Sequence, residues 1–259
     1  MRAHATFLTL AVLVSACATS LPGNDPIQRA ESLRQQGRIA EARRVLTDYL
    51  ERHPEQLDAR YNLALIHAQQ GDTDTAIRLY RANLARAAHL PSSVNLALLY
   101  QRRRLFSAAL QVLQDAARAY PRRALPRYLI GIIHWQQGQL SAAKQAFLRA
   151  LAAEPGNGYA HWHYARYLAS TGQRTAALAE TRKAVHMQPD CANCWRFYAQ
   201  LLAAQGRPYD AIAAYQHSLA IRPDTATRQA LITLFEQTGE HRRAQRMRQA
   251  LTQWQASHE

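Results

Sequence analysis

Residues 131–155 have the sequence GIIHWQQGQLSAAKQAFLRALAAEP, and their pattern recurs along nearly the whole chain. A small residue, Gly131, stands seven positions before Gly138, and Ala143 follows that glycine after five. Pro155 comes seventeen positions after the glycine. Glycine readily ends a helix in a left-handed conformation, and proline cannot continue one. The stretch therefore predicts two helices that are joined at Gly138 and closed by Pro155.

The glycine recurs with a spacing of 33 or 34 residues. We call its places the turn positions: Gly37, Gly71, Arg104, Gly138, Gly172, Gly206 and Gly239. Alanine follows every turn position after five residues: Ala42, Ala76, Ala109, Ala143, Ala177, Ala211 and Ala244. The residue seven positions before is small in six of the seven cases, and the last case has Ile232. We expect these small residues to face each other and let two helices cross closely.

This pattern resembles the tetratricopeptide repeat, a helix–turn–helix unit of 34 residues. The resemblance covers residues 23–258 and implies an all-α fold, a right-handed superhelical solenoid of about seven repeats. The expected repeats are 23–56, 57–89, 90–123, 124–157, 158–191, 192–224 and 225–258. Composition agrees, because 49 alanines against 6 valines and 10 isoleucines disfavour a β-sandwich or a parallel α/β sheet.

Helix ends and the last repeat add detail to this prediction. Asp25 before Pro26 is a good N-cap with proline at the first helical position, and Pro208 should likewise open a second helix. The last repeat carries Arg248 where most earlier repeats have a large apolar residue. A polar face of this kind is typical of a terminal capping repeat.

The N-terminal segment resembles a bacterial lipoprotein signal. An apolar run from Phe7 ends in Val14-Ser15-Ala16-Cys17, which resembles a lipobox. The resemblance implies a signal peptide over 1–16, lipidation of Cys17, and a short lipidated tether over 17–22. In that family Ala18, rather than Asp, implies the outer membrane, with the repeats facing the periplasm. The alternative is an ordinary signal peptide that is cleaved near Ala16 or Ala18.

In the resembled family the first helices of successive repeats line a concave groove that binds peptides. Asn62 and Asn95 match asparagines that hold the backbone of an extended peptide, while Arg166 and Arg196 are expected to hold a carboxylate. Trp135 would join an aromatic wall along this face. The predicted groove residues are Tyr61, Asn62, Asn95, Tyr128, Tyr159, Trp162, Arg166 and Arg196. The alternative is that several of the aromatic residues belong to the core between repeats.

Charge is strongly basic and uneven. The formal net charge is +14, from 32 Lys and Arg against 18 Asp and Glu. A basic edge is expected at Arg102, Arg103, Arg104, Arg122 and Arg123. An exported protein meets anionic lipid, polysaccharide phosphate or an acidic partner there rather than nucleic acid. The alternative is a solvated edge without a ligand.

Catalytic and metal motifs are absent from the sequence. Cys191 and Cys194 form a Cys-Ala-Asn-Cys pair, for which an oxidising compartment favours a local disulfide. No second cysteine pair completes a zinc site, and no βαβ pattern supports a thioredoxin-like role. We therefore predict no metal, no cofactor and no enzymatic activity, with a thiol oxidoreductase using Cys191 and Cys194 as the alternative from another class.

The predicted function is a non-enzymatic scaffold for protein–protein interaction, tethered to the outer membrane through Cys17. Length, lipobox and repeat number resemble the lipoproteins of type IV pilus biogenesis and related pilus assembly. That resemblance implies help in assembling an envelope machine such as a pilus or secretin system. An adaptor for cell-wall hydrolases or periplasmic proteases is the alternative scaffold. The expected partner is a periplasmic protein or peptide.

Overall fold

The computed structural model describes residues 25–256, and every regular element in that range is an α-helix. The prediction of an all-α solenoid built from helix pairs is confirmed. The predicted signal peptide, the tether and Cys17 lie outside the described residues. The helices are α1 (Pro26–Gln35), α2 (Ile39–Arg52), α3 (Leu57–Gln69), α4 (Thr73–Arg86), α5 (Leu90–Arg102), α6 (Phe106–Ala119), α7 (Ala124–Gln136), α8 (Leu140–Ala153), α9 (Gly158–Ser170), α10 (Arg174–Met187), α11 (Ala192–Ala204), α12 (Pro208–Ile221), α13 (Thr225–Gln237) and α14 (His241–Ala256).

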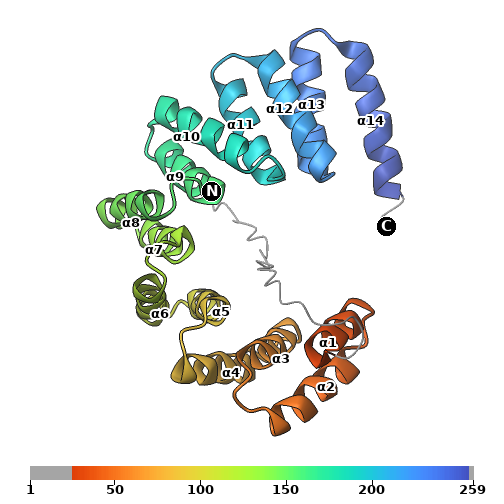
Figure 1. Cartoon of the computed structure of the whole chain (residues 1–259). Coiled ribbons are helices and arrows are strands. Elements are labelled where there is room, and N and C mark those ends of the chain that lie inside the picture. Colours follow the sequence, from red (N-terminus) through yellow and green to blue (C-terminus); the bar gives the residue numbers. More distant parts are fainter. Residues whose placement is uncertain (1–24, 257–259) are drawn as a thin grey trace. The chain divides into compact units, whose positions relative to one another are not determined.

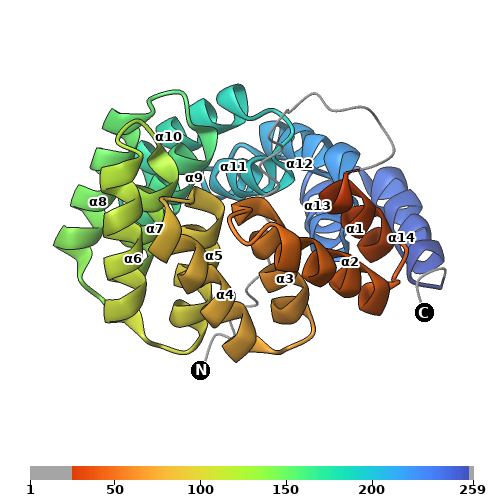
Figure 2. The same ribbon diagram turned by 60° about the horizontal axis from the view of Figure 1, so that its bottom comes forward.

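The helices form two compact units, α1–α6 and α7–α14, divided after Tyr120. Within each unit, consecutive helices pair and the pairs stack side by side (Figure 1). The odd-numbered helices lie on one side of each stack, and α1 contacts α3 just as α7 contacts α9 (Figure 2). We call this the inner side of each unit. It is the side on which the predicted groove residues lie.

The turn positions have the backbone conformation that the sequence predicts. The six glycines there have φ between 71° and 83°, which is the left-handed region. Arg104 has φ 60° and is the only non-glycine residue with positive φ within residues 25–256. Each turn therefore keeps the same geometry, even where glycine is missing.

The small residues pack at the helix crossings as expected. All seven alanines that follow the turn positions are buried, from Ala42 through Ala244, and so are the six small residues that stand seven positions before a turn position. One close crossing is at Gly131, where a Cβ atom would lie 2.9 Å from the ring of Phe147. The residue seven positions before a turn position and the residue nine positions after it therefore pack into the same volume between the two helices.

Helix ends follow the predicted caps. The Asp25 carboxylate accepts a hydrogen bond from the Ile27 amide at 3.0 Å, and α12 begins at Pro208. In the last repeat α14 buries only Ala244 and Leu251, while Arg248 is exposed and pairs with Glu236. The terminal helix therefore presents a polar outer face, as a capping repeat should.

A recurring hydrogen bond between repeats was not predicted. A side chain eleven residues before the turn position donates to the carbonyl of the proline six residues earlier. Arg60 donates to Pro54, His161 to Pro155 at 2.9 Å, and Trp195 to Pro189 at 2.8 Å. These bonds tie α3, α9 and α11 to the end of the preceding repeat and satisfy the carbonyl of its proline.

Candidate functional site

The groove residues of the first unit bond to each other and to the backbone. Tyr61 and Asn62 lie on α3, and Asn95 lies on α5. The Asn95 amide donates to the Tyr61 hydroxyl at 3.0 Å, and the Asn62 amide donates to the Asp58 carbonyl at 2.9 Å. A ligand that used both asparagines would have to replace these bonds.

In the second unit, Arg166 on α9 lies against two indole rings. Its guanidinium carbon is 5.0 Å from the ring centroid of Trp162 and 5.9 Å from that of Trp135. Within residues 25–256 it makes neither a hydrogen bond nor an ion pair. Burial lowers the pKa of Arg166, and the positive charge of Arg196 lowers it further. Arg166 is therefore a half-buried cation with cation–π support but no carboxylate partner.

Two ring nitrogens next to Arg166 also lack partners. The Trp162 Nε1 and the His163 Nδ1 are buried atoms that find no hydrogen-bond partner in the described part of the chain. The His163 ring stacks on Tyr128 with 4.9 Å between centroids. Burial, with a further effect from Arg166, lowers the pKa of His163 to about 3, so this ring is neutral at pH 7. The charge on this part of α9 comes from Arg166.

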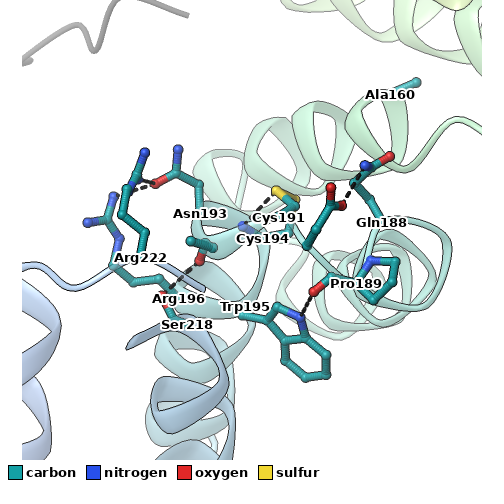
Figure 3. Close-up of a disulfide and its surroundings, with 12 residues drawn as sticks. Ala160, Gln188, Pro189, Cys191, Asn193, Cys194, Trp195, Arg196, Ser218 and Arg222 are labelled. Carbon is teal, nitrogen blue, oxygen red and sulfur yellow. Dashed lines mark hydrogen bonds between the residues drawn. A yellow bond between two sulfur atoms is a disulfide. The ribbon is translucent and has the colours of Figure 1, made fainter. Parts of the chain in front are cut away.

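A second group of cations lies at the start of α11. Arg196 and Arg222 both donate to the Oδ1 of Asn193, at 3.1 and 2.7 Å (Figure 3). Arg196 also lies 3.5 Å from the Asp224 carboxylate. We call Arg166, Arg196 and Arg222 the arginine cluster. These contacts leave the Arg196 side chain half-buried.

Tyr128 does not line the groove. It is 5% exposed, and it packs in the core of the second unit with Phe147 and Tyr164, so the alternative assignment to the core holds for this residue. Burial raises the pKa of Tyr128. Tyr159 and Trp162 are half-buried and remain partly accessible on α9.

A disulfide joins Cys191 and Cys194 at the turn between α10 and α11 (Figure 3). Both cysteines are buried, and Cys191 caps α11 by accepting a hydrogen bond from the Cys194 amide. Tyr159 and Trp162 pack against this buried cluster. The disulfide thus supports the end of α11 that carries Asn193 and Arg196.

The arginines of the predicted basic edge fall into two groups, one before α6 and one after it. Arg102, Arg103 and Arg104 precede α6, whereas Arg122 and Arg123 follow it in the second unit. The 14 residues of α6 span about 20 Å, so its two ends are far apart. Arg103 also pairs with Asp74 at 2.6 Å, and Arg123 lies 4.0 Å from Glu154. The basic edge stays a prediction.

His161 and His163 lie on different faces of α9, as their spacing predicts. His161 is buried, and its Nδ1 lies 2.6 Å from the Glu180 carboxylate. Lys183 donates to the other oxygen of Glu180 at 2.8 Å. This network connects α9 to α10 and leaves His161 no free nitrogen for a ligand.

Sequence analysis missed Asn193 and Arg222. Arg222 lies after α12, 26 residues beyond Arg196, so no local spacing connects them. Within residues 25–256 no three His, Cys, Asp or Glu side chains are placed to hold a metal ion. In the same range, no helix has the length and apolar character needed to cross a bilayer.

The stacked helix pairs with small residues at their crossings define a helical-repeat protein. A tetratricopeptide-repeat family model matches residues 27–91 and 94–158, and a second such model matches residues 134–201. The chain belongs to the tetratricopeptide repeat family. No curated protein matches its sequence significantly.

Solved structures show the same fold. The structure of Pseudomonas aeruginosa pilF is 19% identical with a TM-score of 0.61, covering 79% of this chain and 94% of that one. A tetratricopeptide repeat protein from Parabacteroides merdae is 18% identical with a TM-score of 0.59, covering 88% and 91%. A chain of the APC/C hetero-tetramer Cut9–Hcn1 is 19% identical with a TM-score of 0.60, covering 85% of this chain. The present chain spans only 42% of the length of that one.

Membership of this family makes the chain a scaffold for protein–protein interaction. Tetratricopeptide repeats bind protein or peptide partners and are in general not enzymatic. The candidate site for a partner is the inner side of the second unit, where Trp162, Arg166 and Arg196 lie. There the protein offers partly exposed cations, of which Arg166 has no anionic partner among the described residues.

Proposed function

We propose that the protein is an outer-membrane lipoprotein whose repeats hold a partner protein in the periplasm during assembly of an envelope machine such as a type IV pilus or secretin system. The observation that carries the proposal is the lipobox-like Val14-Ser15-Ala16-Cys17 placed directly before a tetratricopeptide-repeat region. The fold shared with Pseudomonas aeruginosa pilF agrees with the resemblance to pilus-assembly lipoproteins, but it speaks for the architecture alone.

The mechanism is presentation. Acyl chains on Cys17 would anchor the protein, because more than one chain gives stable membrane binding. The repeats would then raise the local concentration of the partner at the membrane surface, which favours assembly without any new chemistry. The candidate binding surface is the inner side of the second unit.

Replacement of Cys17 tests the anchor. The change Cys17→Ala should abolish incorporation of labelled palmitate and release the protein from the outer-membrane fraction. Cys191→Ser with Cys194→Ser is the matched control and should keep both the label and the fractionation. A wild-type protein that takes up no label would show that the lipoprotein assignment is wrong.

Capture from envelope extracts tests the pathway. Cross-linked wild-type protein should retain a pilin or a secretin subunit, and a strain lacking the gene should assemble fewer secretin multimers. Capture of a cell-wall hydrolase or protease, with normal secretin assembly in that strain, would replace the proposal with the adaptor alternative.

A further inference from the structure

We infer that the inner side of the second unit binds an extended internal segment of a partner protein that carries two acidic side chains at alternate positions, one held by Arg166 and the other by Arg196 with Arg222. The inference rests on the scaffold function proposed above and names the chemistry of its ligand.

The arginine cluster carries more positive charge than its surroundings balance. The one carboxylate in contact with the cluster is that of Asp224, next to Arg196, so three guanidinium groups and one carboxylate carry a formal charge of +2 (three minus one). Asp224 is already engaged as the N-cap of α13, since it accepts bonds from the Thr227 amide and hydroxyl at 2.9 and 2.6 Å. Arg196 and Arg222 therefore share the neutral oxygen of Asn193, which cannot neutralise either of them.

Arg166 has no anionic partner, and the buried Trp162 donor beside it is unused. A half-buried guanidinium without an anion is costly, and so is a buried donor without an acceptor. Arg166 has no acceptor in the described part of the chain, and the Trp162 Nε1–H beside it has none either. A carboxylate has two oxygens that accept several hydrogen bonds, and the planar guanidinium binds such a group in a bidentate manner. One acidic side chain would give Arg166 its missing anion.

The two binding points require two carboxylates. Arg166 lies on α9 and Arg196 on α11, the inner helices of successive repeats. The Arg166 guanidinium lies against the indole rings of Trp162 and Trp135. Those of Arg196 and Arg222 meet instead at the Asn193 oxygen, so each point takes a carboxylate of its own. Alternate side chains of an extended chain point to the same side and are about 6.6–6.8 Å apart at the backbone, so they present two carboxylates to one face. A C-terminal acidic residue also has two carboxyl groups. Both are attached through the same Cα atom, so they lie closer together than two alternate side chains.

The first unit provides an internal comparison. On its inner helices, Arg34 of α1 forms a two-pronged pair with Glu31 at 2.6 and 2.8 Å. Its groove side chains Tyr61 and Asn95 satisfy each other. Acceptors for cations are therefore built into the inner side of the first unit, whereas the second unit leaves them to a ligand.

A positional-scanning library of acetylated and amidated hexapeptides tests this inference on the full-length protein. We expect selection of Asp or Glu at two positions separated by one residue, and at least tenfold weaker binding when either acid becomes Asn or Gln. Arg166→Gln should remove the preference at one position, and Arg196→Gln with Arg222→Gln at the other. Arg182→Gln is the control, because Arg182 is exposed on α10. Thermal melts of each variant check folding, and the Asn and Gln peptides test the wild type independently of the variants.

The outcomes separate the inference from the proposed function. Selection of neutral or basic peptides overturns the acidic ligand and leaves the scaffold intact. A peptide that binds only with a free C-terminal carboxylate overturns the internal segment. Capture of a pilin or secretin subunit that survives loss of all three arginines likewise overturns the inference but not the function.

Discussion

Arg104 shows how strictly a single turn residue is specified. A left-handed conformation costs a residue with a Cβ atom about 1–2 kcal/mol, and the other six turn positions avoid this cost with glycine. The turn at Arg104 could be predicted from the sequence alone, because the spacing of the glycines does not depend on distant contacts. Arg222 could not be predicted in the same way, since its partner Asn193 is 29 residues away in the chain and only the fold brings them together.

Replacement of Arg104 by glycine should stabilise the protein. Removing the strained Cβ at φ 60° should raise the free energy of unfolding by about 1 kcal/mol. Arg102→Gly, at the end of α5, is the matched control and should lower it by up to about 1 kcal/mol. Urea unfolding curves measure both. Equal destabilisation by the two changes would contradict the assignment of strain to Arg104.

Glu180 makes stability dependent on pH. Burial alone would raise its pKa, but hydrogen bonds from His161 and Lys183 outweigh burial and lower the pKa below its ordinary value of 4.5. A lowered carboxyl pKa adds stability above the unfolded value, and this stability is lost as the pH falls through the folded value. Glu180→Gln should therefore cost about 2 kcal/mol at pH 6 and progressively less below pH 4.5.

Thermal melts of the wild type and of Glu180→Gln between pH 3 and pH 6 check this prediction. Glu51→Gln, an exposed change on α2, is the control and should shift the melting temperature little at any pH. A gap between wild type and Glu180→Gln that is constant over this range would contradict a role for the ionised carboxylate.

At the scale of helices, the residues seven before and nine after a turn position divide one volume. Ala30 lies with Leu46 in the core of the first repeats, and Gly131 leaves room for the larger Phe147. The small residues seven before the turn positions and the alanines five after them could be predicted, because their spacing alone identifies them. The sequence could not predict which large residue requires a glycine rather than an alanine opposite it, since this depends on the rotamer that Phe147 adopts.

Gly131→Ala should destabilise the fourth repeat. The new methyl group would lie 2.9 Å from the Phe147 ring in a fully buried site, and overpacking costs about 1–3 kcal/mol. Gly131→Ala combined with Phe147→Leu recreates the Ala–Leu pair of the first repeat and should recover part of the loss. Non-additive free energies in a double-mutant cycle measure this coupling. Additive effects would show that the two side chains do not share a space.

The disulfide should stabilise the turn between α10 and α11. Cross-linking a loop of only four residues (191–194) contributes about 2 kcal/mol in the chain-entropy description. Cys191→Ala with Cys194→Ala should lower the denaturation midpoint accordingly, and a dithiol reductant should lower that of the wild type but not of this variant. If the reductant left the denaturation midpoint of the wild type unchanged under unfolding conditions, the two cysteines would not be joined by a disulfide.

At the scale of the molecule, composition and period predicted the architecture. They could not predict which of the two units carries the candidate binding site. The groove was expected to run evenly from Tyr61 to Arg196. The structure instead has satisfied side chains on the inner side of the first unit and unsatisfied ones on that of the second. Whether a polar side chain is already bonded depends on contacts between repeats, which a one-dimensional pattern does not contain.

The net charge of +14 should raise the association rate of an acidic partner through long-range electrostatic attraction. Arg102→Gln with Arg103→Gln and Arg104→Gln lowers the charge to +11 (14 minus 3), and so do the same changes at the exposed Arg43, Arg44 and Arg52 of α2. Distant charges mainly change the association rate and its salt dependence, whereas a desolvated contact changes the dissociation rate.

Both triple variants should therefore slow association alike, by a few-fold at low salt, and leave dissociation unchanged. Arg166→Gln should speed dissociation by tenfold or more at any ionic strength. Stopped-flow kinetics with the best acidic hexapeptide, at 20 and 300 mM salt, separate these effects, because the Debye length shortens from about 20 Å to about 6 Å. If only the Arg102–Arg104 variant lost binding, the turn before α6 would be the contact surface. The arginine cluster would then have no role in holding the partner.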